Sequence, residues 1–283
     1  MKFRDLLRLF GHRVWFDFEM LRLASGEAAE SVHTEVYRWR RTGRLIELRR
    51  GLFVLAEPWR KQIIQGAELA DPIYSPSYLS GRWALRYWKL LPPMPGLEYS
   101  SVSARPARTF TNSFGTYSYA TLPRDLLFGT TIFPGAEIFD GATCSSGVEA
   151  FADPAKALQA GTDKRFLQDS IRRASLPRIA LAEKALLDLC FIEGGEWDTT
   201  RLAGLGLASP FKDLEPATPI PGPGILTARP GIDPEKLGAM AERSGRPRLI
   251  RAAKAFSKLA AGRGSRGAQD AEAPRLSWRR EEP

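Results

Sequence analysis

A predicted helix over residues 32–42 carries polar and basic side chains on one side. At about 100° per residue, four of them fall together: Thr34, Tyr37, Arg38 and Arg41. The opposite side is apolar and is expected to pack: Val32, Val36 and Trp39. Arginine side chains suit both phosphate oxygens and the edge of guanine. A solvated surface helix has a similar composition, so this side alone indicates nucleic-acid binding only weakly.

A short basic turn follows this helix, in the segment TGRLIELRRGLFVL (residues 42–55). Its two apolar stretches, separated by Arg49, Arg50 and Gly51, predict a two-stranded hairpin in which the glycine supplies the turn. We expect both arginines to project at the tip, and apolar residues to anchor the strands: Ile46 and Leu48 in the first, Phe53 and Leu55 in the second. A second basic site in this place strengthens the prediction of contact with a polyanion.

Cap residues define the helices that would position these side chains. Asp17 and Gly26 frame a helix over about 18–25, and Ser31 and Gly43 frame the basic helix. The order of helices and hairpin predicts a winged helix-turn-helix, in which the last helix enters the DNA major groove and the hairpin touches the adjacent backbone. Six residues are therefore predicted to contact double-stranded DNA: Thr34, Tyr37, Arg38, Arg41, Arg49 and Arg50.

The charge distribution supports a division of the chain into parts with different tasks. The net charge is +9, but residues 1–62 hold 13 Lys/Arg against 8 Asp/Glu, residues 63–242 hold 17 against 20, and residues 243–283 hold 11 against 4. Both ends are basic and the middle is mildly acidic, which points to a polyanion at the ends and a different task in the middle. With 283 residues and 43% hydrophobic content, the chain is long enough for two domains.

Little in the sequence indicates catalysis or cofactor binding. There are two histidines, two isolated cysteines (Cys144 and Cys190) and no carboxylate cluster with metal-ligand spacing. The segment PIPGPGILTARPG lacks the Lys-Ser/Thr ending of a phosphate-binding loop. We therefore expect a protein that is not an enzyme and needs no metal or cofactor. The isolated cysteines, with no signal peptide and no long apolar run, favour a cytoplasmic protein without membrane contact.

The predicted fold class is α+β, with the winged helix at 1–62 and a larger mixed α/β domain at 68–260. In the larger domain, Ser77 caps a predicted helix over 77–91, and residues 98–139 predict several antiparallel strands. The segment IALAEKALLDLCF predicts a helix over 179–191, with Ile179 in its apolar stripe. A Pro/Gly-rich loop is expected over 204–231, helices over 234–245 and 248–260, and a disordered basic tail over 261–283.

Three features of the larger domain and tail have both a functional and a structural interpretation. The aromatic residues of segment 77–91 could stack nucleic-acid bases, but a core role explains them better: Tyr78, Trp83, Tyr87 and Trp88. Glu183 and Lys184 are adjacent on a predicted helix, so their side chains diverge by about 100° and do not easily share a metal site. The basic C-terminal stretch fits DNA binding, RNA binding or plain solubility.

Three segments, in this order, resemble the AbiEi family of bacterial antitoxins from type IV toxin–antitoxin systems: TGRLIELRRGLFVL, YSPSYLSGRWAL and IALAEKALLDLCF. The resemblance extends to about residue 260. It implies an N-terminal winged helix that represses its own operon, a larger C-terminal domain needed for antitoxin activity, and a nucleotidyltransferase-like toxin as genetic partner. Motif matching carries over only the basic residues Arg38, Arg41, Arg49 and Arg50. The 204–231 loop and the basic tail depart from the family.

The expected function is thus that of a DNA-binding antitoxin that represses its own promoter and counteracts such a toxin, with phage defence as the implied setting. Two alternatives remain open. One is a stand-alone winged-helix transcriptional regulator whose second domain senses a ligand or forms dimers. The other is a nucleic-acid-processing enzyme that the winged helix delivers to its substrate.

Overall fold

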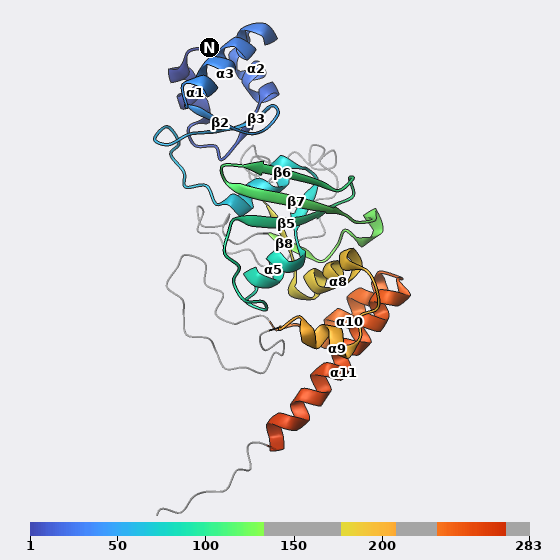
Figure 1. Ribbon diagram of the computed structural model, residues 1–283. Coiled ribbons are helices and arrows are strands. Elements are labelled where there is room, and N and C mark those ends of the chain that lie inside the picture. The colour runs from blue at the N-terminus through green and yellow to red at the C-terminus, as the bar shows by residue number, and fades with distance from the viewer. Residues whose placement is uncertain (133–176, 208–230, 270–283) are drawn as a thin grey trace, which may run out of the picture.

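The computed structural model describes residues 1–132, 177–207 and 231–269, with side chains described through residue 261. The described chain is α+β, which confirms the predicted fold class. Three helices and a small sheet form one end of the molecule, and a six-stranded sheet with further helices forms the rest (Figure 1). None of the helices in these stretches is long and apolar enough to cross a membrane.

The N-terminal elements are α1 (Phe3–Phe10), β1 (Phe16–Asp17), α2 (Phe18–Ser25), α3 (Ala29–Arg41), β2 (Leu45–Arg49) and β3 (Leu52–Leu55). The three strands form an antiparallel sheet in the order β1-β3-β2. Asp17 accepts a hydrogen bond from the Met20 N–H at 2.7 Å and Gly26 is left-handed, which confirms both predicted ends of α2. The prediction of Ser31 as the cap of α3 is wrong, because the hydrogen-bond ladder already begins at the Ala28 carbonyl.

The six-stranded sheet has the order β6-β7-β5-β4-β9-β8. Its strands are β4 (Ser77–Leu79), β5 (Glu98–Ser103), β6 (Arg108–Asn112), β7 (Gly115–Thr121), β8 (Thr130–Ile132) and β9 (Arg178–Ala180). The sheet is mixed, since β5 pairs parallel with β7 and β4 pairs parallel with β9. The prediction of antiparallel strands is therefore wrong for β5 and β7, because β6 turns back on β7 and places β7 beside β5. Residues 133–139 of that prediction lie outside the described residues.

Segment 77–91 is a strand followed by a short helix, which corrects the predicted helix capped by Ser77. Strand β4 comes first, and α5 (Gly81–Tyr87) follows. Ser77 pairs with Ser103 of β5 instead of capping a helix. Pairing with β5 and β9, which lie far away in the sequence, overrides the local helical pattern. Between β3 and β4 lie the 3₁₀ turn η1 (Gly66–Leu69) and α4 (Ala70–Ile73), and between β7 and β8 lies η2 (Arg124–Leu126).

Helix α8 (Ala182–Glu193) is buried on almost every side. Its apolar residues Leu186, Leu189 and Cys190 are buried as predicted, but Glu183, Lys184 and Asp188 are buried with them. The prediction that Ile179 belongs to this helix is wrong, because Ile179 lies in β9 and pairs with Leu79. The helix is packed against α5 and the C-terminal helices (Figure 1).

The last helices are α9 (Thr199–Gly204), α10 (Pro234–Arg243) and α11 (Pro247–Gln269). Asp233 caps α10 by accepting the N–H groups of Glu235 and Lys236, as predicted. Helix α11 runs beyond its predicted end at 260 and takes in residues 261–269, the first part of the predicted tail. Residues 270–283 and most of the predicted 204–231 loop, from 208 to 230, lie outside the described residues.

Two hydrophobic cores meet at the β2–β3 hairpin. One face of the hairpin joins the helices α1 to α3 through Leu45, Phe53 and Leu55. The other face joins the core of the six-stranded sheet through Leu48, Leu52 and Val54. Side chains alternate between the two faces of a strand, so one short hairpin supplies apolar residues to both cores. Figure 1 shows the hairpin between the N-terminal helices and β6.

Candidate nucleic-acid interface

The four predicted residues of α3 lie together on its exposed side: Thr34, Tyr37, Arg38 and Arg41. The opposite side is buried as expected, with Val32, Val36 and Trp39 in the N-terminal core. Tyr37 is 60% exposed, which is a large exposed fraction for an aromatic side chain. An exposed aromatic ring among arginines on a helix is a suitable surface for a nucleic acid.

Local contacts hold two of these arginines in place. Arg38 Nη1 lies 2.9 Å from Glu35 Oε1, one helical turn earlier, and the Arg41 guanidinium lies over the Tyr37 ring at 5.9 Å from its centroid. Exposed ion pairs of this kind contribute little stability, about 0.3–0.5 kcal/mol. The contact with Glu35 therefore restricts the orientation of Arg38 without preventing it from reaching a stronger anion.

The tip of the β2–β3 hairpin presents Arg49 and Arg50, both exposed. Gly51 makes the turn with φ +79°, a left-handed conformation that glycine adopts without strain. The hairpin is joined to α3 by Glu47. Its Oε2 lies 2.6 Å from Arg40 Nη2, and its Oε1 accepts the Gly51 N–H at 3.2 Å. One carboxylate therefore connects the C-terminal end of α3 to the turn that carries the two exposed arginines.

The cations of this surface differ in whether they have a carboxylate partner. Arg38 and Arg40 are paired with Glu35 and Glu47. Among the described residues, Arg41, Arg49 and Arg50 form no ion pair, so their charge is available to an external anion. Sequence reasoning placed the arginines but missed both glutamates. The i,i+3 spacing could have revealed Glu35, whereas nothing local in the sequence links Glu47 to Arg40.

The hairpin is also fixed from the side of the larger sheet. Asn112, at the end of β6, donates its side-chain N–H to the Leu48 carbonyl at 3.3 Å. Together with the burial of Leu48, Leu52 and Val54, this contact attaches the hairpin to β6. The exposed tip is thus carried by a hairpin that is held on both faces.

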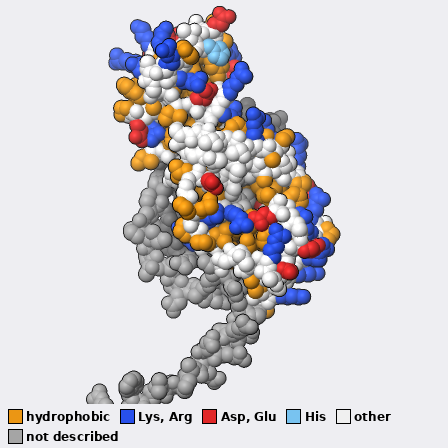
Figure 2. All heavy atoms as spheres, viewed as in Figure 1, with side chains coloured by type: hydrophobic (Ala, Val, Ile, Leu, Met, Phe, Trp, Pro, Cys, Tyr) orange, Lys and Arg blue, Asp and Glu red, His pale blue; other side chains and the backbone are white. Residues whose placement is uncertain are grey.

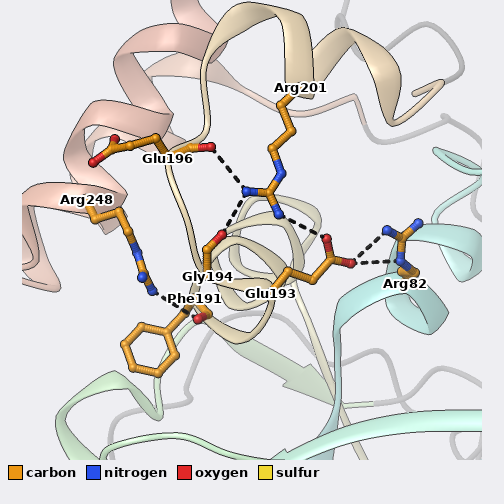
Figure 3. A network of polar contacts seen from close by, with 7 residues as sticks. All are labelled: Arg82, Phe191, Glu193, Gly194, Glu196, Arg201 and Arg248. Atoms are coloured by element: carbon orange, nitrogen blue, oxygen red, sulfur yellow. Dashed lines mark hydrogen bonds and ion pairs between the residues drawn. The ribbon is translucent and has the colours of Figure 1, made fainter.

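Several of the basic residues in the described helices of the larger domain are engaged in contacts within the protein. Arg201 donates to the Gly194 and Glu196 carbonyls and pairs with Glu193, which also binds Arg82 (Figure 3). Arg248 donates to the Phe191 carbonyl, and Arg251 pairs with Glu196. These contacts join α5, α8, α9 and α11, so the charges of these arginines stabilise helix packing. Lys254 and Lys258 of α11 remain exposed.

A buried polar cluster lies between β4 and α8. Asp188 accepts hydrogen bonds from Tyr78 Oη at 3.0 Å and Ser80 Oγ at 2.7 Å, and it pairs with Lys184. Burial raises the pKa of Asp188 and lowers the pKa of Lys184, while each partner opposes the shift of the other. Lys184 and Asp188 are only 2% and 1% exposed, so an external ligand does not reach them. We interpret the cluster as structural.

The aromatic residues of segment 77–91 divide into two pairs. Tyr78 and Trp88 are buried, as the core interpretation predicted, and Trp88 Nε1 donates to the Ala180 carbonyl at 2.8 Å. Trp83 and Tyr87 are only partly buried. In the stretches that the structure describes, no group of three or more His, Cys, Asp and Glu side chains could hold a metal ion.

Comparisons with known proteins return nothing for this chain. No family model matches it, and neither the curated proteins nor the solved structures give a match.

Proposed function

We propose that the N-terminal part of the chain is a winged helix-turn-helix that binds double-stranded DNA. The main support is that α3 exposes Thr34, Tyr37, Arg38 and Arg41 while Glu47 ties this helix to the turn that carries Arg49 and Arg50. In this proposal α3 enters the major groove, and the β2–β3 hairpin contacts the neighbouring backbone. The six predicted residues are the DNA-binding residues.

The regulatory role proposed for this DNA binding is repression of the protein's own promoter. The resemblance to AbiEi antitoxins supports this role and adds a nucleotidyltransferase-like toxin as the genetic partner that the protein counteracts in the cytoplasm. We assign protection from the toxin to the larger domain, because most of its length, residues 68–242, is mildly acidic and therefore poorly suited to a polyanion.

The decisive experiment compares two charge-matched double variants. Arg38→Glu/Arg41→Glu reverses two charges on the exposed side of α3 without touching the buried side. Lys254→Glu/Lys258→Glu makes the same change in net charge on α11, at the opposite end of the molecule (Figure 1). Binding to the promoter upstream of the gene is measured by fluorescence anisotropy, and circular dichroism checks folding.

We expect the affinity of the α3 variant for the promoter to fall at least about a hundredfold. The affinity of the α11 variant should fall only slightly. Equal losses would show that net charge, and not the α3 surface, determines binding. In a growth assay with the toxin induced, the folded α3 variant, expressed from a foreign promoter, should still protect cells. Failure to protect at an unchanged protein level would contradict the separation of the two tasks.

A further inference from the structure

His33 lies on α3 beside the exposed side that carries the proposed DNA-binding residues, and its imidazole is exposed as well. At about 100° per residue, His33 falls about 90° from the centre of that side and about 40° from Tyr37, one turn further along. It therefore belongs to the flank of α3. On the face of the molecule shown in Figure 2, Lys and Arg side chains gather over the N-terminal helices, so this flank belongs to a basic end of the molecule.

The imidazole of His33 is held flat against the ring of Phe18, the first residue of α2. The centroids of the two rings are 4.0 Å apart, and the interplanar angle is 22°. Phe18 is fixed in turn, because it packs against the N-terminal core and its N–H donates to the Gly51 carbonyl at 3.0 Å. An aromatic ring attracts a cation that lies over its face, so the stack suits a protonated imidazole.

The nitrogens of this imidazole have no partner within the described part of the chain, where no residue forms a hydrogen bond or an ion pair with them. The charged and titratable groups on the elements around the ring come from α2, α3 and the hairpin turn: Asp17, Glu19, Arg22, Glu30, Tyr37 and Arg50. Asp17 already accepts the Met20 N–H at 2.7 Å, and Glu19 pairs with Arg22 at 2.8 Å. The imidazole is therefore available to an external acceptor.

The flank of a helix that lies in the major groove faces the DNA backbone. The groove is about 12 Å wide and a helix with its side chains is about 10–12 Å across, so side chains on the flank meet the walls of the groove, where the phosphates lie. Phe18 also contacts the hairpin turn, which is the part proposed to touch the backbone. A protonated imidazole has two N–H donors, and its hydrogen bond to a phosphate oxygen is assisted by charge.

We propose that His33, in its protonated form, binds a phosphate of the DNA beside α3. This inference rests on the proposed DNA binding by α3 and the hairpin, and it adds a seventh residue to that surface. A phosphate beside the ring favours the charged imidazole, so the complex takes up a proton when it forms. Affinity for DNA therefore rises as the pH falls through the range from 8 to 5, where histidine ordinarily changes its charge.

The chain contains only two histidines, which provides a matched control. His12 follows α1 and is also exposed, with its Nε2 3.2 Å from Lys61 Nζ. Fluorescence anisotropy at pH 5.5 and pH 8, at constant ionic strength, measures the affinities of the wild-type protein, His33→Ala and His12→Ala for the promoter and for a random duplex of the same length. Other groups that titrate in this range are present in all three proteins, so the difference made by His33→Ala belongs to His33.

The ratio of the affinity at pH 5.5 to the affinity at pH 8 should be about tenfold greater for the wild-type protein and His12→Ala than for His33→Ala, with both duplexes. The slope of log affinity against log salt should be steeper by about 1 at pH 5.5 than at pH 8, except in His33→Ala. His33→Lys should bind at pH 8 about as tightly as the wild-type protein binds at pH 5.5, because lysine keeps its charge.

Equal ratios of affinity in the wild-type protein and His33→Ala would overturn this inference and leave DNA binding itself intact. An effect of His33→Ala that is confined to the promoter would also overturn it, since that result would indicate contact with a base. Absence of promoter binding at both pH values would contradict the proposed function, and this inference with it. Circular dichroism at both pH values checks that every variant is folded.

Discussion

Glu47 and Arg40 join the hairpin to α3 through an ion pair of 2.6 Å between Oε2 and Nη2. The other carboxylate oxygen of Glu47 accepts the Gly51 N–H, so the same side chain also supports the turn beside Arg49 and Arg50. An acidic residue on a surface proposed to bind DNA would be unfavourable if it acted through charge alone. Its contacts indicate that it positions the two basic sites relative to each other.

Replacement of Glu47 by glutamine should therefore reduce sequence discrimination and leave general DNA affinity intact. Loss of a half-exposed ion pair corresponds to about 0.2–1 kcal/mol, which limits the loss in the ratio of promoter to random-DNA affinity to about fivefold. Affinity for random DNA should stay equal or rise slightly, since one negative charge is removed. Competition binding with the two DNAs measures both quantities. Glu57→Gln, which breaks the exposed pair with Arg60, is the matched control; an equal effect there would rule out a positioning role for Glu47.

The hairpin arginines should contribute affinity that does not depend on sequence. If the protein neutralises about four to six phosphates, log affinity against log salt should have a slope of about −4 to −5. Arg49→Ala/Arg50→Ala should weaken binding to all DNA alike and make the slope shallower by about 2, because a wing mainly contacts the backbone. Salt titrations of both proteins test this. A variant that keeps its affinity for random DNA but loses its sequence preference would contradict the backbone role.

Leu186→Asp should unfold the larger domain. Leu186 is fully buried in α8, and an unpaired carboxylate there is expected to cost at least about 3 kcal/mol. Ile192→Asp puts the same side chain on the same helix at a position that is 41% exposed, and should cost less than about 1 kcal/mol. Urea denaturation compares the two. Similar losses would mean that the position on α8 does not matter. If the larger domain protects from the toxin, only Leu186→Asp should abolish protection.

The free energy of unfolding should depend on how many of the acceptor oxygens of Asp188 are removed. Asp188→Ala leaves Lys184, Tyr78 and Ser80 without their acceptor inside the core, and should cost about 3–5 kcal/mol. Asp188→Asn keeps one carbonyl oxygen and should cost less, about 1–3 kcal/mol. Urea midpoints of the two variants give the comparison. An alanine variant as stable as the asparagine variant would show that the hydrogen bonds to Asp188 contribute nothing.

The thiol of Cys190 should be protected until the protein unfolds. Burial raises the pKa of Cys190 to about 12, so only about one thiol in ten thousand is the reactive thiolate at pH 8. In a Cys144→Ser background, labelling with a thiol reagent should therefore follow the urea unfolding curve. Rapid labelling of the native protein would show that the helices around α8 open locally.

Local patterns were sufficient for part of this fold. Asp17 and Asp233 cap helices as predicted, because a cap depends only on residues within one turn. Ser77 and Ile179 were assigned to helices and lie in strands, because their partners on β5 and β4 are distant in the sequence. The exposed side of α3 follows from helical periodicity alone. Glu47, and the pairing of Asp188 with Tyr78, depend on tertiary contacts that no local pattern encodes.

The two buried faces of the β2–β3 hairpin limit how the molecule can move. A hinge between the N-terminal helices and the larger sheet would have to expose Leu48, Leu52 and Val54 to water. The hairpin therefore cannot swing as a free arm, and in the proposed DNA complex the N-terminal helices and β6 would keep their places relative to each other. For the same reason, residues 1–62 transferred to another protein would carry an apolar surface that the new host would have to cover.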